Sequence, residues 1–95
     1  IMGKDYTVLS KDIVKYVGTE KNIISVFHCA TRLRFKVKKN EEVNLDKLKS
    51  LEGVITAMNS GGQIQVVIGN QVDNVYQAVL KNSDIKKDQK ESEYH

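Results

Sequence analysis

The sequence predicts an α+β domain: a four-stranded, largely antiparallel sheet with its helices on one face, in the order α-β-β-α-β-β-α. Two observations carry this prediction. Segments with apolar residues at helical spacing lie near both ends of the chain, and stretches rich in β-branched residues alternate apolar and polar positions between them. Proline is absent, so glycines and polar clusters separate the elements. Helices on one face would leave the other face of the sheet more polar.

The first expected element is an amphipathic helix over residues 5–17. Its apolar stripe consists of Val8, Leu9, Ile13, Val14 and Val17. Ser10 and Lys11 fall on the opposite side of the helix, and Gly18 is a suitable stop signal. The segment should therefore pack one face against the core.

Residues 22–38 are expected to form two strands, with residues 29–31 in the connection between them or at its edge. In the second strand Leu33, Phe35 and Val37 alternate with arginines and lysines. Because successive side chains of a strand point to opposite faces, the apolar set should face the core and the cations should face away from it.

The second half of the sequence predicts one short helix, two strands and a final helix. Asn44 can cap a helix that ends near Leu51, and Gly53 closes it. The elements expected after it are a strand at 54–58, a tight turn at 60–62, a strand at 63–68 and a helix at 72–80.

A domain of residues 4–81 is expected, followed by a disordered tail or linker at 82–95. This last stretch is rich in Lys, Asp, Glu, Gln and Ser and has almost nothing to bury.

The composition limits the class of protein. With 95 residues, the chain is long enough for one small domain. Its single cysteine cannot form an internal disulfide, which favours a reducing, cytosolic setting. No apolar run has the length of a membrane span, so no direct membrane insertion of this chain is expected. The net charge of +3 favours anionic partners without choosing among them.

Cys29 is the candidate for chemistry, because Arg32 and Arg34 follow it closely. Positive charge favours the thiolate over the thiol, and guanidinium groups suit a multi-oxygen anion such as a phosphoryl group. These residues indicate a cysteine that receives a phosphate and passes it on. Most lone cysteines are instead small buried apolar residues, and the local composition leaves both interpretations open.

Four segments taken together resemble the IIB domain of the bacterial sugar phosphotransferase system, in its glucose, sucrose and β-glucoside branch. The segments are Asn22-Ile23, His28-Cys29-Ala30-Thr31-Arg32-Leu33-Arg34-Phe35, Gly53-Val54 and Gly61-Gly62-Gln63-Ile64-Gln65-Val66-Val67-Ile68-Gly69. The resemblance covers about residues 4–80 in the same order. The sequence departs from the family at Thr19, where members often have a second glycine, and this bears on the local turn geometry rather than on the chemistry.

The resemblance implies a phosphocarrier on the cytoplasmic side of the bacterial cell membrane, with the same α+β fold. Cys29 would accept phosphate from a phosphohistidine of the IIA domain and deliver it to a sugar held by the membrane domain IIC. Arg32 and Arg34 would support the transfer, and Gln65 matches a glutamine close to the cysteine. Thr31 belongs to the same motif and is expected near the phosphate. No metal and no cofactor is expected.

Two other functions remain open from the sequence. Five basic residues fall between Arg32 and Lys39, which suits a small nucleic-acid-binding module, although no nucleic-acid-binding signature accompanies them. A IIB-like regulatory module, phosphorylated as a signal, is also compatible with the motif. His28 is given no catalytic role here, and Tyr76 is expected in the core.

Overall fold

The computed structural model describes residues 5–85, and within this range its elements follow the predicted order. The longer elements are α1 (Thr7–Val17), β1 (Ile23–His28), β2 (Arg32–Val37), α2 (Leu45–Ser50), β3 (Thr56–Ser60), β4 (Gln63–Val67) and α3 (Val72–Asn82). Short 3-10 helices follow α1 at Glu20–Asn22 and β2 at Asn40–Glu42.

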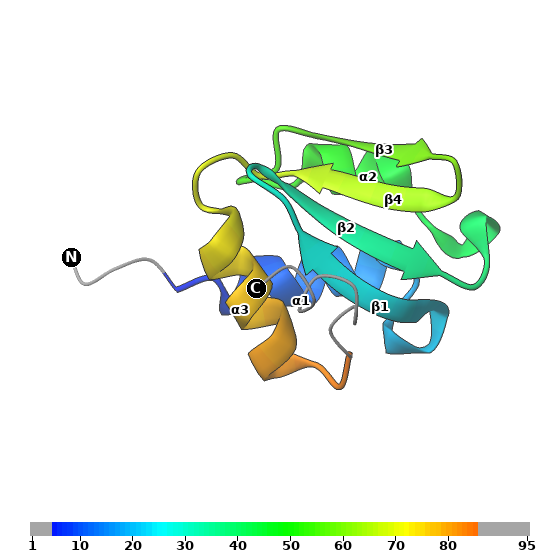
Figure 1. Ribbon diagram of the computed structural model, residues 1–95, viewed down its shortest axis with the longest axis horizontal. Coiled ribbons are helices and arrows are strands. Elements are labelled where there is room, and N and C mark those ends of the chain that lie inside the picture. The colour runs from blue at the N-terminus through cyan, green and yellow to red at the C-terminus, as the bar shows by residue number, and fades with distance from the viewer. Residues whose placement is uncertain (1–4, 86–95) are drawn as a thin grey trace.

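The four strands form one sheet in the order β1-β2-β4-β3, and every neighbouring pair is antiparallel. The helices pack together on one side of this sheet: α1 contacts both α2 and α3, α3 contacts β1 and β2, and α2 contacts β3 (Figure 1). The predicted fold class is therefore confirmed. The central position of β2 and β4 places the strand that follows Cys29 in the middle of the sheet.

As the alternation of apolar and polar residues along the strands predicts, the apolar side chains lie in the core and the polar ones on the open face of the sheet. Leu33 and Phe35 of β2 and Ile64 and Val66 of β4 are fully buried beneath the helices. Val37, at the end of β2, is only half-buried. Burying side chains of this size contributes about 1.5–3 kcal/mol each, so this row is a main source of stability.

The C-terminal boundary lies later than predicted. Helix α3 continues to Asn82, and Ile85 is buried in the core although both residues were assigned to the tail. One isoleucine among polar residues carries no periodicity, which explains why the sequence pattern missed it. Residues 86–95 of the predicted tail lie outside the described residues.

The third strand lies two residues later than predicted. Val54 donates its N–H to Leu51 in a turn, and β3 begins at Thr56. The strand runs on to Ser60, which pairs with Gln63, so that only Gly61 and Gly62 form the turn. Both glycines have positive φ angles of 62° and 89°, the conformation that two-residue hairpin turns require.

The end of α1 is joined to the end of β2 through Asn22. Gly18 ends α1 in a left-handed conformation with φ 115°. The buried side chain of Asn22 donates to the carbonyl groups of Val17 at 2.8 Å and Lys39 at 3.0 Å and accepts from the N–H of Lys39. Three hydrogen bonds of one amide thus fix the helix against the sheet.

Thr19, which follows Gly18, has strained backbone angles. Its φ of 72° and ψ of 174° fall in a region that is essentially restricted to glycine. Its side chain accepts a long hydrogen bond of 3.4 Å from the N–H of Lys21. The threonine that follows Gly18 therefore adds backbone strain to the folded state.

We expect Thr19→Gly to stabilise the domain by about 1 kcal/mol, because relief of about 1–3 kcal/mol of strain exceeds the entropy cost of glycine. Thermal unfolding should shift upwards by about 4–8 °C. Thr56→Gly is the matched control: this threonine is half-buried in β3, and glycine should destabilise the strand there. A lower midpoint for Thr19→Gly would contradict the strain argument.

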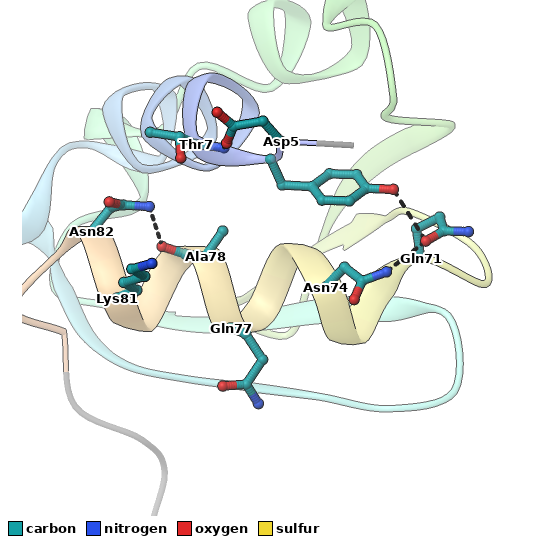
Figure 2. Close-up of a pocket in the computed structure, with 9 residues that line it drawn as sticks. Asp5, Thr7, Gln71, Asn74, Gln77, Ala78, Lys81 and Asn82 are labelled. Atoms are coloured by element: carbon teal, nitrogen blue, oxygen red, sulfur yellow. Dashed lines mark hydrogen bonds between the residues drawn. The ribbon is translucent and has the colours of Figure 1, made fainter. Parts of the chain in front are cut away.

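An open groove of about 570 Å³, lined mostly by residues with polar side chains, lies between the start of α1 and α3 (Figure 2). Within it, the hydroxyl of Tyr6 and the amide nitrogen of Asn74 both donate to Oε1 of Gln71. Hydrogen bonds from the side chain and the N–H of Thr7 hold the pKa of the exposed Asp5 below its usual range. None of the predicted site residues lines this groove.

Candidate functional site

Cys29 lies at the tip of the β1–β2 hairpin and is exposed. Its N–H donates to the carbonyl of Arg32 at 3.0 Å, which closes the hairpin. The carbonyl of Thr31 accepts from the N–H groups of Ile68 at 2.8 Å and Gly69 at 3.0 Å, so the connection after β4 holds the tip in place. An exposed thiol on a fixed turn is not the small core residue that a lone cysteine usually is.

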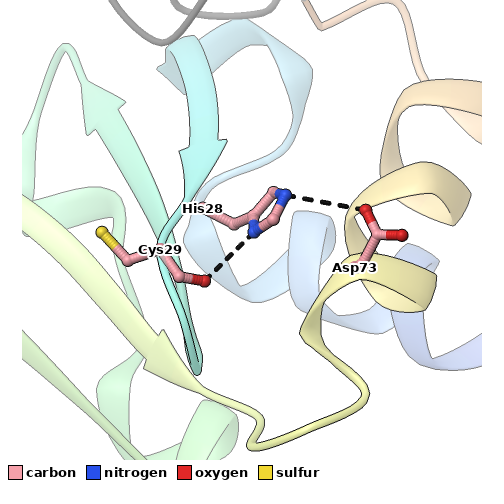
Figure 3. A network of polar contacts seen from close by, with 3 residues as sticks. All are labelled: His28, Cys29 and Asp73. Carbon is pink, nitrogen blue, oxygen red and sulfur yellow. Dashed lines mark hydrogen bonds and ion pairs between the residues drawn. The ribbon is translucent and has the colours of Figure 1, made fainter. Parts of the chain in front are cut away.

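Residues 28 and 29 point to opposite sides of the hairpin, as alternation requires. The ring of His28 lies towards α3, whereas the sulfur of Cys29 points away from that helix (Figure 3). Phe27 pairs with Arg34 across the two strands, and Cys29 lies opposite Arg32 in the hairpin. Residues that pair across strands point to the same face, and so do residues two apart in one strand. The thiol therefore shares the open face of the sheet with Arg32 and Arg34. The prediction of cations on the open face is confirmed.

A chain of side-chain hydrogen bonds crosses the open face from Arg32. Its Nη1 donates to Oε1 of Gln65 at 2.7 Å and lies 3.7 Å from the sulfur of Met58. Nε2 of Gln65 then donates to Oε1 of Gln63 at 2.9 Å, and the same oxygen accepts from Nη1 of Arg34 at 3.0 Å. The two arginines are thus oriented by two glutamines of β4.

Gln65 does not lie on a strand beside Cys29. Its strand, β4, neighbours β2, and its cross-strand partner is Arg34. Its side chain is only 6% exposed, although it belongs to the open face. The side chain of Gln65 contacts Arg32, which is the charged residue opposite Cys29 in the hairpin.

Arg34 lies two cross-strand pairs further from the tip than Arg32. It stands opposite Phe27, and its guanidinium carbon is 6.0 Å from the centre of that ring. Its Nε is buried and has no hydrogen-bond partner among the described residues. Arg34 therefore has a cation–π contact with Phe27 and a buried Nε–H that donates to none of the described residues.

The surface around the tip combines small and apolar side chains with charge. Ala30 and Thr31 are exposed, and Ile55, which lies near Gly69, has 68% of its surface exposed. The sequence left open which of Phe27, Ala30 and Leu33 belongs to this surface. Leu33 is fully buried and Phe27 half-buried, so that Ala30 alone of the three is exposed.

Sequence reasoning gave no role to three residues that the structure connects to the site. Gln63 shares the face of Gln65, as the period-two pattern predicts, but the sequence alone gave it no role. His28 and Asp73 are brought together by the packing of α3 on the hairpin, for which the sequence carries no local signal. Tyr76 is buried, as predicted, and contacts the His28 ring.

The described residues also bear on two other classes of protein, metal-binding and membrane-spanning. Between residues 5 and 85, three or more His, Cys, Asp or Glu side chains do not come together as a metal centre would require. In the same part of the chain, each helix is too short or too polar to cross a membrane.

The described residues thus define a class: a small α+β domain that presents an exposed cysteine on the same face of the sheet as two oriented arginines. A family model described as "phosphotransferase system, EIIB" matches residues 11–44. A crystal structure of one domain of a PTS IIabc component from Clostridium difficile superposes with a TM-score of 0.77 at 34% identity, covering 86% of this chain and 85% of that one.

Longer relatives agree with the match. A β-glucoside-specific EIIBCA component of Halalkalibacterium halodurans is 54% identical over 76 residues, which cover 80% of this chain and 12% of that protein. A sucrose-specific EIIBC component of Bacillus subtilis is 36% identical over 86 residues, 90% of this chain and 19% of that protein. The chain belongs to the EIIB domain family of the phosphotransferase system, in the glucose, sucrose and β-glucoside branch. It spans only a small part of the relatives' length.

Proposed function

We propose that this chain is a phosphocarrier in which Cys29 accepts phosphate from a phosphohistidine of an EIIA domain and passes it to a sugar held by a membrane EIIC domain. The observation that supports this most is the exposed thiol on the same face as two oriented arginines. Relatives whose names join EIIB with EIIC and EIIA suit such partners. The domain would work at the cytoplasmic side of the bacterial membrane.

The transfer consists of two in-line displacements at phosphorus. In the first, the thiolate of Cys29 forms an S–P bond while the P–N bond to the donor imidazole breaks, and the bonding pair leaves with the nitrogen. In the second, a sugar hydroxyl forms an O–P bond and gives up its proton, while the S–P bond breaks and the thiolate returns. Loose phosphoryl-transfer transition states require mainly positioning and charge stabilisation from the protein.

Charge stabilisation would come from Arg32 first. It is the arginine opposite Cys29 in the hairpin, and its hydrogen bond to Gln65 restricts its rotamers before the phosphate arrives. Arg34 would contribute its positive charge from the same face of the sheet, since its Nε is buried and so is not accessible to a phosphate. The exposed tip also presents Thr31 and the N–H groups of Ala30 and Thr31, which donate no hydrogen bond within residues 5–85. Such N–H groups suit phosphate oxygens.

The proposal is tested by intact mass after incubation with a phosphorylated EIIA domain of a β-glucoside-specific relative. We expect one added phosphate on the native chain and none on Cys29→Ser. Because Cys29 is exposed and bonds only through its backbone N–H and carbonyl, serine should leave the fold unchanged. A phosphate on both chains, or on neither with several competent donors, would reject Cys29 as the acceptor.

A further inference from the structure

Gln63 is the residue at which the hydrogen bonds of the two arginines on the open face meet. Its Oε1 accepts from Nη1 of Arg34 at 3.0 Å and from Nε2 of Gln65 at 2.9 Å. Oε1 of Gln65 in turn accepts from Nη1 of Arg32 at 2.7 Å. Gln63 is thus linked to Arg32 through the amide of Gln65.

The pairing of β2 with β4 explains why these hydrogen bonds run diagonally across the sheet. Arg34 lies directly opposite Gln65, but the residue opposite Arg32 is Val67, whose side chain has no acceptor. Arg32 therefore takes the oxygen of Gln65, and Arg34 takes the oxygen of Gln63. Each arginine is bonded to a glutamine that is displaced by two residues from its own cross-strand position.

The direction of the two amides follows from the chemistry of arginine. A guanidinium group has five N–H donors and no acceptor, so it must face an amide oxygen rather than an amide nitrogen. Arg34 fixes the oxygen of Gln63 in this way, and the same oxygen is the acceptor for Nε2 of Gln65. With its nitrogen held by Gln63, Gln65 presents its oxygen to Arg32.

Burial makes the hydrogen bond between the two glutamines important. Gln65 is only 6% exposed, whereas Gln63 and both arginines are half-buried. Gln63 supplies the acceptor that Nε2 of Gln65 has within residues 5–85. Because an unpaired buried donor is costly, removal of that acceptor would drive the Gln65 amide to turn towards water, and its oxygen would then leave Arg32.

The other neighbour of Arg32 gives weaker support. The sulfur of Met58 lies 3.7 Å from the same Nη1, and a thioether is only a weak acceptor. Met58 comes from β3, where it pairs with Gln65 across the strands. The orientation of Arg32 therefore depends mainly on Gln65, and the orientation of Gln65 depends on Gln63.

We infer that Gln63 is a positioning residue for Arg32: by accepting from Arg34 and from Gln65, it directs the oxygen of Gln65 at Arg32 and keeps that guanidinium oriented for a phosphoryl group at Cys29. The effect on transfer rests on the proposed function. The hydrogen-bond network does not, and it can be measured separately.

The network is tested by ¹⁵N NMR of the side-chain amide and guanidinium groups. In the native chain, we expect an amide hydrogen of Gln65 to exchange slowly with water and the Arg32 guanidinium to rotate slowly about its Nε–Cζ bond. Gln63→Met keeps the length of the side chain but removes the oxygen, so both processes should become faster. Gln63→Glu keeps an acceptor oxygen and should restore the slow exchange and the slow rotation.

Gln77→Met is the matched control. It makes the same substitution at an exposed position of α3 and should change neither the NMR signals nor the transfer rate. If Gln77→Met accelerated the exchange of the Gln65 amide as much as Gln63→Met does, a general loosening of the fold would explain the result and the inference would be wrong.

The positioning role is tested by single-turnover transfer from phosphorylated EIIA. Gln63→Met should be about three- to tenfold slower than the native chain, the effect of one lost hydrogen bond. In the Arg32→Gln background, Gln63→Met should lose most of this effect, because the group that it positions is already absent. An effect that kept its full size in Arg32→Gln and vanished in Arg34→Gln would show that Gln63 acts through Arg34 instead, and would overturn the inference.

The two proposals fail in different ways. Equal exchange of the Gln65 amide and equal rotation of the Arg32 guanidinium in the native and Gln63→Met chains would overturn the role of Gln63, even if transfer is normal. Absence of transfer to the native chain would overturn the phosphocarrier role, and the NMR signals would still decide whether Gln63 orients Arg32.

Discussion

Arg32→Gln is expected to slow phosphoryl transfer to Cys29 by about 10²-fold or more, the usual effect of removing one preorganised donor from a charged transition state. Arg32 closes the hairpin opposite Cys29 and carries its charge on the same face as the thiol. Its guanidinium is held by Gln65 at 2.7 Å, so little reorganisation is needed when charge develops. Glutamine keeps a polar side chain of moderate length but removes the charge.

Two variants on the same strand give the comparison. Arg34→Gln should have a smaller effect, about tenfold or less, because Arg34 lies opposite Phe27 and is engaged by Gln63. Lys36→Gln removes the next cation on the same face and should leave the transfer rate unchanged. Stopped-flow or quenched single-turnover assays would rank the three. Equal losses for Arg32→Gln and Lys36→Gln would point to general electrostatic attraction, and oligonucleotide binding would then be the function to test.

The fold was predictable because its elements repeat simple local patterns. Alternation in β2 separated Leu33 and Phe35 from Arg32 and Arg34 without any knowledge of the sheet. The Asn44 cap is real: its side chain accepts from the N–H of Lys47 at 3.1 Å. The third strand was misplaced because its exact start depends on where Val67 can pair, and the sequence contains no local signal for that.

The site was only partly predictable, for a related reason. Cys29 and its arginines are adjacent in sequence, and their shared face follows from alternation. The partners that orient the arginines come from elsewhere: Gln63 and Gln65 lie beside them through the pairing of β4 with β2. The contact of His28 with Asp73 likewise comes from the packing of α3. Such contacts depend on strand order and helix docking, which local patterns do not determine.

Gly18→Ala should destabilise the domain by about 3 kcal/mol, a large part of the stability of a chain of this size. The φ of 115° at Gly18 strains any residue with a Cβ, which costs about 1–3 kcal/mol. The added Cβ would also lie 2.5 Å from Nδ2 of Asn22. Since that buried amide bonds to Val17 and to both backbone groups of Lys39, displacing it breaks the link between α1 and the end of β2.

Gly61→Ala separates the two contributions to this loss. Gly61 also has a positive φ, 62°, but an added Cβ there would meet nothing within 4 Å. Backbone strain alone should then cost about 1–2 kcal/mol. Urea unfolding of both variants gives the difference, which measures what the contact with Asn22 contributes. If Gly18→Ala lost no more than Gly61→Ala, Asn22 would have to move without cost, and its three hydrogen bonds could not be what joins the helix to the sheet.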